Sequence, residues 1–101
     1  MVNIYLDDCR KTPAIYDIRT YTVEETIDQL IKNKGNVEFL SLDNDLGEEL
    51  AEGYKVLDWL EEEFYVNNFP LPKIILVHSA NSAAMMRMNS VISKLYKGEN
   101  K

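Results

Sequence analysis

Short apolar segments recur along the chain, and four of them have the pattern of strands. Val2–Leu6 alternates apolar and polar residues and is rich in β-forming side chains, and Ile18–Tyr21 predicts a second, shorter strand. Val37–Leu42 predicts the third strand. Lys73–Val77 is almost wholly apolar and β-branched, which is typical of a strand buried on both faces of a parallel sheet.

Three further segments carry apolar residues at helical spacing. The first begins in a capping box, with Thr22 as N-cap and Glu25 at the third helical position, and Gly35 is placed to end it. Gly98 is expected to stop the last helix. The three apolar stripes are Val23, Ile27, Leu30 and Ile31; Val56, Leu57, Leu60 and Phe64; and Met85, Met88, Val91, Ile92 and Leu95.

Strands that alternate with helices predict an α/β fold with a mostly parallel four-stranded sheet and right-handed crossovers. The 101 residues are expected to form one domain, 1–101, with 98–101 as a frayed tail. No apolar run approaches the roughly 20 residues that span a bilayer, and the N-terminus has no signal-peptide pattern. The single cysteine excludes an internal disulfide and fits a reducing compartment, so we expect a cytoplasmic protein.

The net charge of −6 is unevenly distributed along the chain. Residues 37–72 contain ten acidic side chains and one basic, whereas residues 73–101 contain five basic and one acidic. A solvated acidic helix face accounts for most of the charge in the middle of the chain. Because this is not the broadly basic surface of a nucleic-acid binder, we expect no double-stranded DNA partner, and no membrane partner either.

Three predicted strands end in polar residues, and ligands of an open parallel sheet bind outside the carboxyl ends of its strands. Four carboxylates at these ends would lie close together, so either some are protonated or a cation lies between them. Oxygen ligands without a cysteine cluster favour Mg²⁺ or Mn²⁺ over Zn²⁺, and such a metal would attract a phosphate. The three ends are Asp7-Asp8, Asp43-Asn44-Asp45 and His78-Ser79-Ala80-Asn81.

Each polar end also has a purely structural interpretation. Paired aspartates cap helices and stabilise turns, and Ser79 and Asn81 are favoured N-caps, although a helix N-terminus can also bind an anion. His78 either hydrogen-bonds neighbouring backbone or acts as a general acid–base or a metal ligand. Arg10 is a surface charge, a partner of the acidic cluster, or a ligand of a substrate phosphate.

These motifs resemble those of a known family. Asp7-Asp8, Asp43 and Ser79 resemble the acidic pair, the phosphoacceptor aspartate and the hydroxyl residue of response-regulator receiver domains. A closer resemblance, from Val2 to about Leu95, is to a receiver offshoot, the cyclic-phosphate processing receiver-like domain family. It rests on Leu6-Asp7-Asp8-Cys9-Arg10 with Pro13, on Ser41-Leu42-Asp43-Asn44-Asp45-Leu46-Gly47, and on His78-Ser79-Ala80-Asn81 with Arg87-Met88.

The resemblance implies a truncated receiver-like (flavodoxin-like) three-layer fold, and the chain departs from both groups. Members of the offshoot usually have His where this chain has Asn44. Relative to receivers, the first helix is reduced to the loop 9–17, and the final strand, its helix and its phosphate-holding lysine have no counterpart. We therefore expect no ordinary phosphorelay switching. The fourth strand would be an edge unless strand order or a homodimer covers it.

The implied function is metal-dependent hydrolysis of a cyclic phosphate in a nucleotide or an RNA terminus, in a family associated with RNA repair and with conflicts between bacteria and phages. Two alternatives stay open. One is a non-catalytic module that binds a cyclic nucleotide or a metal–phosphate as a sensor or sequestering protein, and the other is a degenerate receiver phosphorylated at the third strand end. The candidate residues are Asp7, Asp8 and Asp43 as metal ligands; Asp43, Asp45 and His78 as catalytic groups; and Arg10, Ser79 and Asn81 as phosphate ligands.

Overall fold

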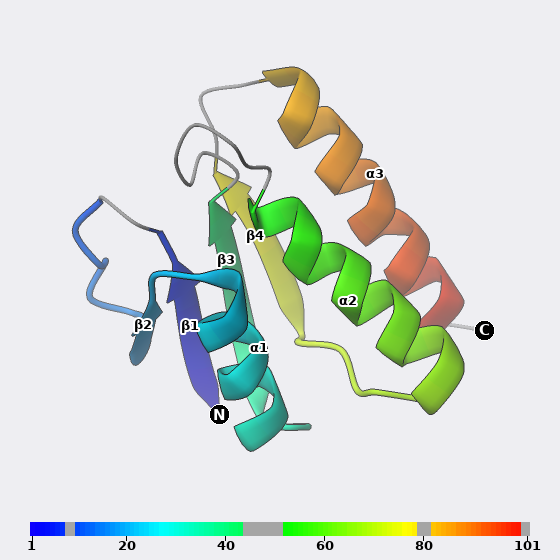
Figure 1. Cartoon of the computed structure of the whole chain (residues 1–101), viewed down its shortest axis with the longest axis horizontal. Helices are drawn as coiled ribbons and strands as arrows, with labels where there is room; N and C mark the ends of the chain where they lie inside the picture. Colours follow the sequence, from blue (N-terminus) through cyan, green and yellow to red (C-terminus); the bar gives the residue numbers. More distant parts are fainter. Residues whose placement is uncertain (8–9, 44–51, 79–81, 100–101) are drawn as a thin grey trace.

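The computed structural model describes residues 1–7, 10–43, 52–78 and 82–99. All strand pairs of its four-stranded sheet are parallel, in the order β2-β1-β3-β4, which confirms the predicted α/β, receiver-like fold. No described helix is long and apolar enough to cross a membrane. In chain order (Figure 1), the elements are β1 (Val2–Leu6), β2 (Ile18–Thr20), α1 (Val23–Lys32), β3 (Val37–Asp43), α2 (Glu52–Asn67), β4 (Ile74–His78) and α3 (Ser82–Glu99).

The strand order places the helices on one face of the sheet. From β2 the chain passes over β1 to β3 and continues to β4 in the same direction, so two right-handed crossovers put α1 and α2 on the same side. Figure 1 shows α1 and α2 in front of the sheet and α3 running beside α2. All three helices contribute to one core, whose most buried members include Ile4, Leu6, Leu30, Leu40, Leu42, Val56, Leu57, Leu60, Ile75 and Met88.

The connection from β1 to β2 runs in the opposite direction and therefore lies on the other face. Its described part, residues 10–17, contains no helix, as the sequence predicted for this loop. The Tyr16 ring lies 4.9 Å from the Tyr5 ring, and the Asn3 side-chain amide donates to the carbonyl of Ile15 at 2.8 Å. This segment therefore contacts β1 on that face of the sheet. No described helix covers this side of the sheet, and we call it the helix-free face.

The prediction that the fourth strand is buried on both faces is wrong. Ile75 is 6% exposed toward the helices, whereas Ile74 and Leu76 are 44% and 45% exposed on the helix-free face. β4 pairs only with β3 among the described strands, so it is an edge strand. Burial on both faces needs crossovers on both sides, and the helical crossovers of this fold all lie on one side.

The predicted N-cap of α1 is confirmed, whereas the reciprocal bond of Glu25 is made with Tyr21, one residue before the N-cap. The Thr22 hydroxyl accepts the backbone N–H of Glu25 at 3.1 Å, and the Glu25 carboxylate accepts the N–H of Tyr21 at 2.8 Å. Beyond α1, Gly35 has a φ of 77°, a left-handed conformation that turns the chain toward β3. Ile31 is exposed instead of buried as predicted, because the buried side of α1 is centred on Val23, Thr26 and Leu30, and Ile31 is turned about 100° around the helix from Leu30.

Helix α3 does not stop at Gly98 as the sequence predicted, but continues to Glu99. A Cβ atom at Gly98 would lie 3.2 Å from the Tyr65 hydroxyl and 3.3 Å from Phe64 of α2. This glycine therefore lies inside the helix, against the side chains of two α2 residues, and does not end it.

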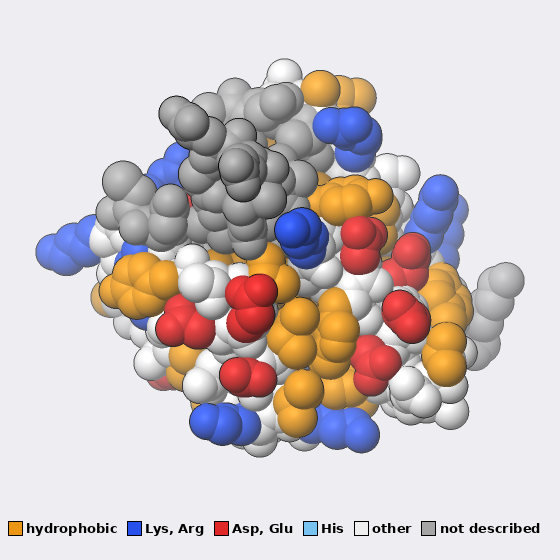
Figure 2. All heavy atoms as spheres, viewed as in Figure 1, with side chains coloured by type: hydrophobic (Ala, Val, Ile, Leu, Met, Phe, Trp, Pro, Cys, Tyr) orange, Lys and Arg blue, Asp and Glu red, His pale blue; other side chains and the backbone are white. Residues whose placement is uncertain are grey.

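The helix-covered face carries the predicted acidic helix surface. Figure 2 shows acidic side chains spread between hydrophobic and basic ones over this side of the molecule. On α2, Asp58 and Glu62 are exposed, whereas Val56, Leu57 and Leu60 are fully buried. Although the Asp58 side chain is exposed, partial desolvation of its carboxyl raises the pKa of this group. The described charge of α2 is thus a solvated surface over an apolar stripe.

Candidate functional site

Three of the predicted side chains converge at the carboxyl-end edge of the sheet. Asp7 follows β1, while Asp43 and His78 are the last residues of β3 and β4 and are directly paired in register. Asp7 is 0% exposed and Asp43 is 2% exposed. One ligand atom from each of the three residues lies within 4.8 Å of the others. We refer to Asp7, Asp43 and His78 as the strand-end cluster.

His78 lies across the helix-free face with both ring nitrogens engaged. Its Nε2 is 3.0 Å from Oδ2 of Asp7, and its Nδ1 is 2.9 Å from the hydroxyl of Ser41. The imidazole stacks on the Tyr5 ring, with centroids 5.0 Å apart and planes 8° from parallel. The side chain therefore reaches over β3 toward β1 and joins the cluster.

Asp7 is surrounded by donors, as a buried carboxylate requires. Its Oδ1 accepts the backbone N–H of Arg10 at 2.9 Å, and its Oδ2 lies 3.3 Å from Nη1 of the same arginine. The Tyr5 hydroxyl donates to Oδ2 at 3.4 Å. Arg10 Nη1 is also 3.9 Å from Oδ1 of Asp43, and the Arg10 side chain is 50% exposed. Arg10 is therefore a cation between both carboxylates and solvent.

A second arginine fixes the backbone of the site. Arg19 Nε donates to the carbonyl of Asp7 at 2.8 Å, and its Nη1 donates to the Thr12 hydroxyl at 2.7 Å. The guanidinium lies 5.5 Å from the ring centroid of Tyr5 and 4.6 Å from that of Tyr21. Burial, and next the negative charge of Asp7, raise the pKa of the Tyr5 phenol, so this group stays a donor to the carboxylate.

Sequence reasoning missed Tyr5 and Ser41, although a signal for both was present. Side chains of a strand alternate between its two faces, so residues two positions apart lie on the same side. Tyr5 and Ser41 stand two positions before Asp7 and Asp43. Polar or aromatic residues at this spacing from a strand-end carboxylate indicate support for the site. Arg19 had no comparable signal, because its role depends on how β2 pairs with β1.

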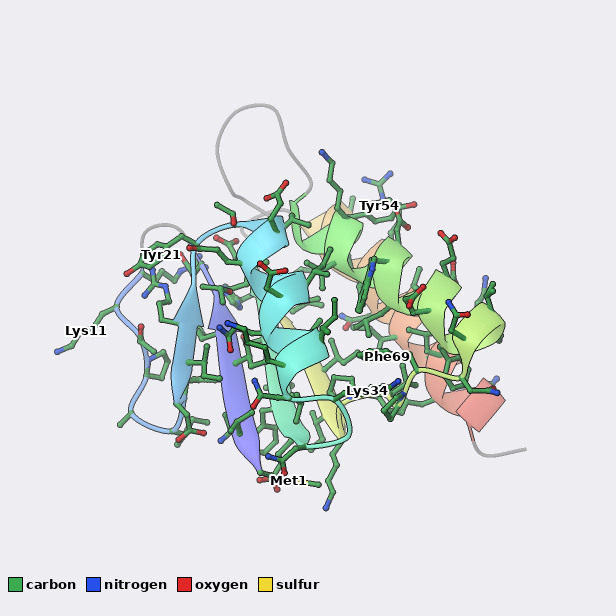
Figure 3. All side chains as sticks on the ribbon, turned by 60° about the horizontal axis from the view of Figure 1, so that its bottom comes forward. Met1, Lys11, Tyr21, Lys34, Tyr54 and Phe69 are labelled. Atoms are coloured by element: carbon green, nitrogen blue, oxygen red, sulfur yellow. The ribbon has the colours of Figure 1, made fainter. Side chains whose placement is uncertain are left out.

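The opposite end of the sheet lacks such chemistry among its described residues. A shallow depression there is lined by Leu30, Gly35, Val37 and Phe69–Pro72. The Lys34 amine lies 5.5 Å from the Phe69 ring, and both are labelled at that end in Figure 3, away from Tyr21 and Tyr54. The lining contains no carboxylate or imidazole, so the strand-end cluster is the stronger candidate for function.

The chain matches the sequence model of the family described as Cyclic-phosphate processing Receiver domain over residues 2–94. It belongs to that family. Searches of the curated proteins and of the solved structures found no significant match. Membership in the cyclic-phosphate processing receiver family implies a role in processing cyclic phosphates, and the strand-end cluster supplies an acidic site at the sheet edge for such a role.

The donor set of this receiver-family chain fits a divalent cation. Two buried carboxylates provide hard oxygen ligands and the imidazole provides one nitrogen, at mutual distances that a single ion can bridge. The sequence had assigned Asp7, Asp8 and Asp43 to the metal and His78 to catalysis. Among the described residues the structure brings His78 next to Asp7 and Asp43, whereas Asp8 lies outside the described residues and its role stays a prediction.

Several predicted site residues fall outside the part of the chain that the structure describes. Asp45 was expected to act in catalysis, and Ser79 and Asn81 to bind phosphate. Asn44, the departure from the usual family pattern, also lies outside. Their roles stay predictions. Arg10, the remaining predicted phosphate ligand, is described and lies against the cluster.

Proposed function

We propose that this chain hydrolyses a cyclic phosphate, in a nucleotide or at an RNA terminus, with a divalent cation held by Asp7, Asp43 and His78. The observation that carries the proposal is the convergence of two buried carboxylates and one imidazole within 4.8 Å, in a member of the cyclic-phosphate processing receiver family. Mg²⁺ or Mn²⁺ suits the oxygen donors, and the imidazole adds a preference for Mn²⁺.

Hydrolysis opens the cyclic diester. The oxygen of water forms a bond to phosphorus, one ring P–O bond breaks, and the departing ring oxygen receives a proton. A divalent cation at the cluster would polarise the phosphate and neutralise the charge that grows on its oxygens. Both nitrogens of His78 already have partners, which disfavours this residue as the general acid–base and leaves Asp45 as the candidate from the sequence for moving the proton.

Arg10 is the described residue best placed to hold the substrate. Its guanidinium lies 3.3 Å from Asp7 and 3.9 Å from Asp43, and half of its side chain faces solvent. A guanidinium binds two oxygens of a phosphate through parallel hydrogen bonds. Because a cation would compete with Arg10 for the carboxylates, its loading would free the guanidinium for the phosphate.

The direct test is turnover of cyclic phosphates. Purified protein would be incubated with Mn²⁺ or Mg²⁺ and a panel of 2′,3′- and 3′,5′-cyclic nucleotides, including RNA with a 2′,3′-cyclic end, and products separated by chromatography. We expect metal-dependent ring opening of at least one substrate class, abolished by a chelator. Folded protein that turns over none of them would contradict the hydrolase.

Asp43→Asn tests the cation site separately from the chemistry. The variant removes one buried charged ligand, so we expect its affinity for Mn²⁺, measured by calorimetry, to fall by about tenfold or more. Without metal, its stability should be equal to or higher than that of the wild type, because repulsion between the carboxylates is relieved. Asp58→Asn removes an exposed acidic group of α2 and should bind Mn²⁺ normally. If both variants bind like the wild type, the cluster does not hold the metal.

A non-catalytic binding module is the second candidate. His78, the single histidine of the chain, has Nδ1 within hydrogen-bond distance of Ser41 and Nε2 within hydrogen-bond distance of Asp7, so its imidazole offers no free nitrogen for acid–base chemistry on a substrate. A nucleotide that raises the melting temperature and is recovered intact would favour this function. A metal-dependent spectral change with beryllofluoride would favour a degenerate receiver instead.

A further inference from the structure

Ser41 lies beside Nδ1 of the His78 imidazole, and the proposed hydrolysis gives it no role. It belongs to β3, between the strands that end at Asp7 and His78, and is only 4% exposed. Its hydroxyl is 2.9 Å from Nδ1 of His78. A buried hydroxyl in a strand costs free energy unless it is hydrogen-bonded, and this one is bonded to a side chain of the strand-end cluster.

A hydroxyl both donates and accepts, so Ser41 fits either neutral form of the imidazole. If Ser41 donates to Nδ1, the ring proton is on Nε2 and is donated to Asp7, 3.0 Å away. If Nδ1 carries the proton and donates to Ser41, the lone pair of Nε2 faces Asp7. Only the second form can bind a cation through Nε2.

We propose that Ser41 is a positioning residue that allows His78 to change from the Nε2–H form to the Nδ1–H form when a divalent cation binds. This inference rests on the proposed metal site. The Nε2 proton passes to solvent and Nδ1 takes one from solvent, so the exchange is balanced and releases no net proton. The stacked Tyr5 ring holds the plane of the imidazole, and the hydroxyl serves both forms without a rotation of the ring.

The single histidine makes this change directly observable. Nitrogen-15 NMR of labelled protein distinguishes a protonated ring nitrogen from a bare or metal-bound one, and Zn²⁺ serves as a diamagnetic probe that accepts imidazole ligands. In the wild type without metal we expect the proton on Nε2. With saturating Zn²⁺ we expect the proton on Nδ1 and a metal-shifted Nε2 resonance.

Ser41→Val and Ser41→Thr form the matched pair, because valine and threonine have nearly the same shape and only threonine keeps the hydroxyl. Ser41→Val should weaken Zn²⁺ binding by about tenfold or more, as loss of a partner that orients a metal-binding histidine does. Ser41→Thr should retain the change of tautomer and most of the affinity. Ser41→Ala, which adds no bulk to the buried site, provides the same comparison if the larger residues disturb folding.

The outcomes separate this inference from the proposed function. Saturating Zn²⁺ that leaves the proton of His78 on Nε2 would overturn the role of Ser41, as would Ser41→Ala and Ser41→Val proteins that bind Zn²⁺ like the wild type. Either result is compatible with hydrolysis of a cyclic phosphate. Conversely, a wild-type protein that shows the change of tautomer but opens no cyclic phosphate would support the role of Ser41 and contradict the hydrolase.

Discussion

The two faces of this sheet differ in both composition and role. The helix-covered face presents Leu6, Leu40 and Leu42, all fully buried against α1, α2 and α3. The helix-free face, built by the alternate residues of the same strands, presents Tyr5 and Ser41, which connect through His78 to the strand-end cluster. Apolar burial on the first face stabilises the fold, whereas hydrogen bonds and ring stacking on the second orient the site.

The comparison explains how a chain of 101 residues carries both a core and a candidate metal site. The central strands contribute core residues to one face and site residues to the other. The core and the candidate metal site therefore use different positions of the same strands. The helix-free face is covered over β1 by residues 10–17 and exposes Ile74 and Leu76 on β4. Substitutions on the two faces should therefore have different consequences.

The largest difference in the free energy of unfolding is expected between the Leu40→Ala and Leu76→Ala variants. Both remove the same atoms from adjacent strands, but Leu40 is fully buried and Leu76 is 45% exposed on the other face. Leu40→Ala should lower the free energy of unfolding by about 3 kcal/mol, because it leaves a cavity in the core. Leu76→Ala should cost about 1 kcal/mol or less, since its side chain already contacts water. Urea denaturation measures both, and equal losses would mean that the helix-free face is covered in solution.

A smaller loss of stability is expected for Gly53→Ala, at the point where α2 contacts the end of β3. A Cβ atom there would lie 2.6 Å from the backbone carbonyl oxygen of Asp43 and 3.0 Å from Met88. Alanine normally favours a helix over glycine by about 1 kcal/mol. Here the backbone contact cannot yield, so Gly53→Ala should destabilise by about 2 kcal/mol and displace Asp43, lowering the affinity for Mn²⁺.

Gly98→Ala is the control for the substitution at Gly53. Its new Cβ would meet only the ends of the Tyr65 and Phe64 side chains, at 3.2 and 3.3 Å. Tyr65 is largely exposed and can move, so we expect little loss of stability and no change in Mn²⁺ binding. A Gly53→Ala protein as stable as the Gly98→Ala protein would show that α2 does not fix the position of Asp43.

Much of the helix-covered face could be predicted from the sequence, because its signal is local. The stripe of Val56, Leu57 and Leu60 and the N-cap at Thr22 follow from spacing within one element. The convergence of the strand ends was also predictable, from the rule that parallel strands share their carboxyl edge. Asp7 and Asp43 obey it.

The errors arose where the outcome depends on tertiary arrangement. β4 has the composition of a doubly covered strand, but the direction of the crossovers leaves Ile74 and Leu76 exposed. The contact between His78 and Asp7 crosses an intervening strand and depends on strand order, which no local pattern encodes. The role of Ser41 can be inferred only once the position of His78 is known, because its hydroxyl contacts the imidazole.

The smallest loss of stability is expected for Tyr5→Phe, which keeps the aromatic ring of Tyr5 and removes only its hydroxyl. The hydroxyl reaches Asp7 at 3.4 Å, a long hydrogen bond, and the carboxylate has better partners in the Arg10 backbone at 2.9 Å and in His78 at 3.0 Å. Its loss should cost about 0.5 kcal/mol, at the low end for a hydrogen bond. The ring remains, so ring-current shifts of the His78 protons should persist.

Tyr5→Leu keeps an apolar side chain but removes the ring that stacks on His78. We expect a further loss of about 1 kcal/mol, since an aromatic pair contributes this much beyond the area it buries. The proton shifts of His78 should move toward random-coil values, and its single set of signals makes them easy to follow. If Tyr5→Phe changes these shifts as much as Tyr5→Leu does, then the hydroxyl, and not the stacked ring, orients the imidazole on the helix-free face.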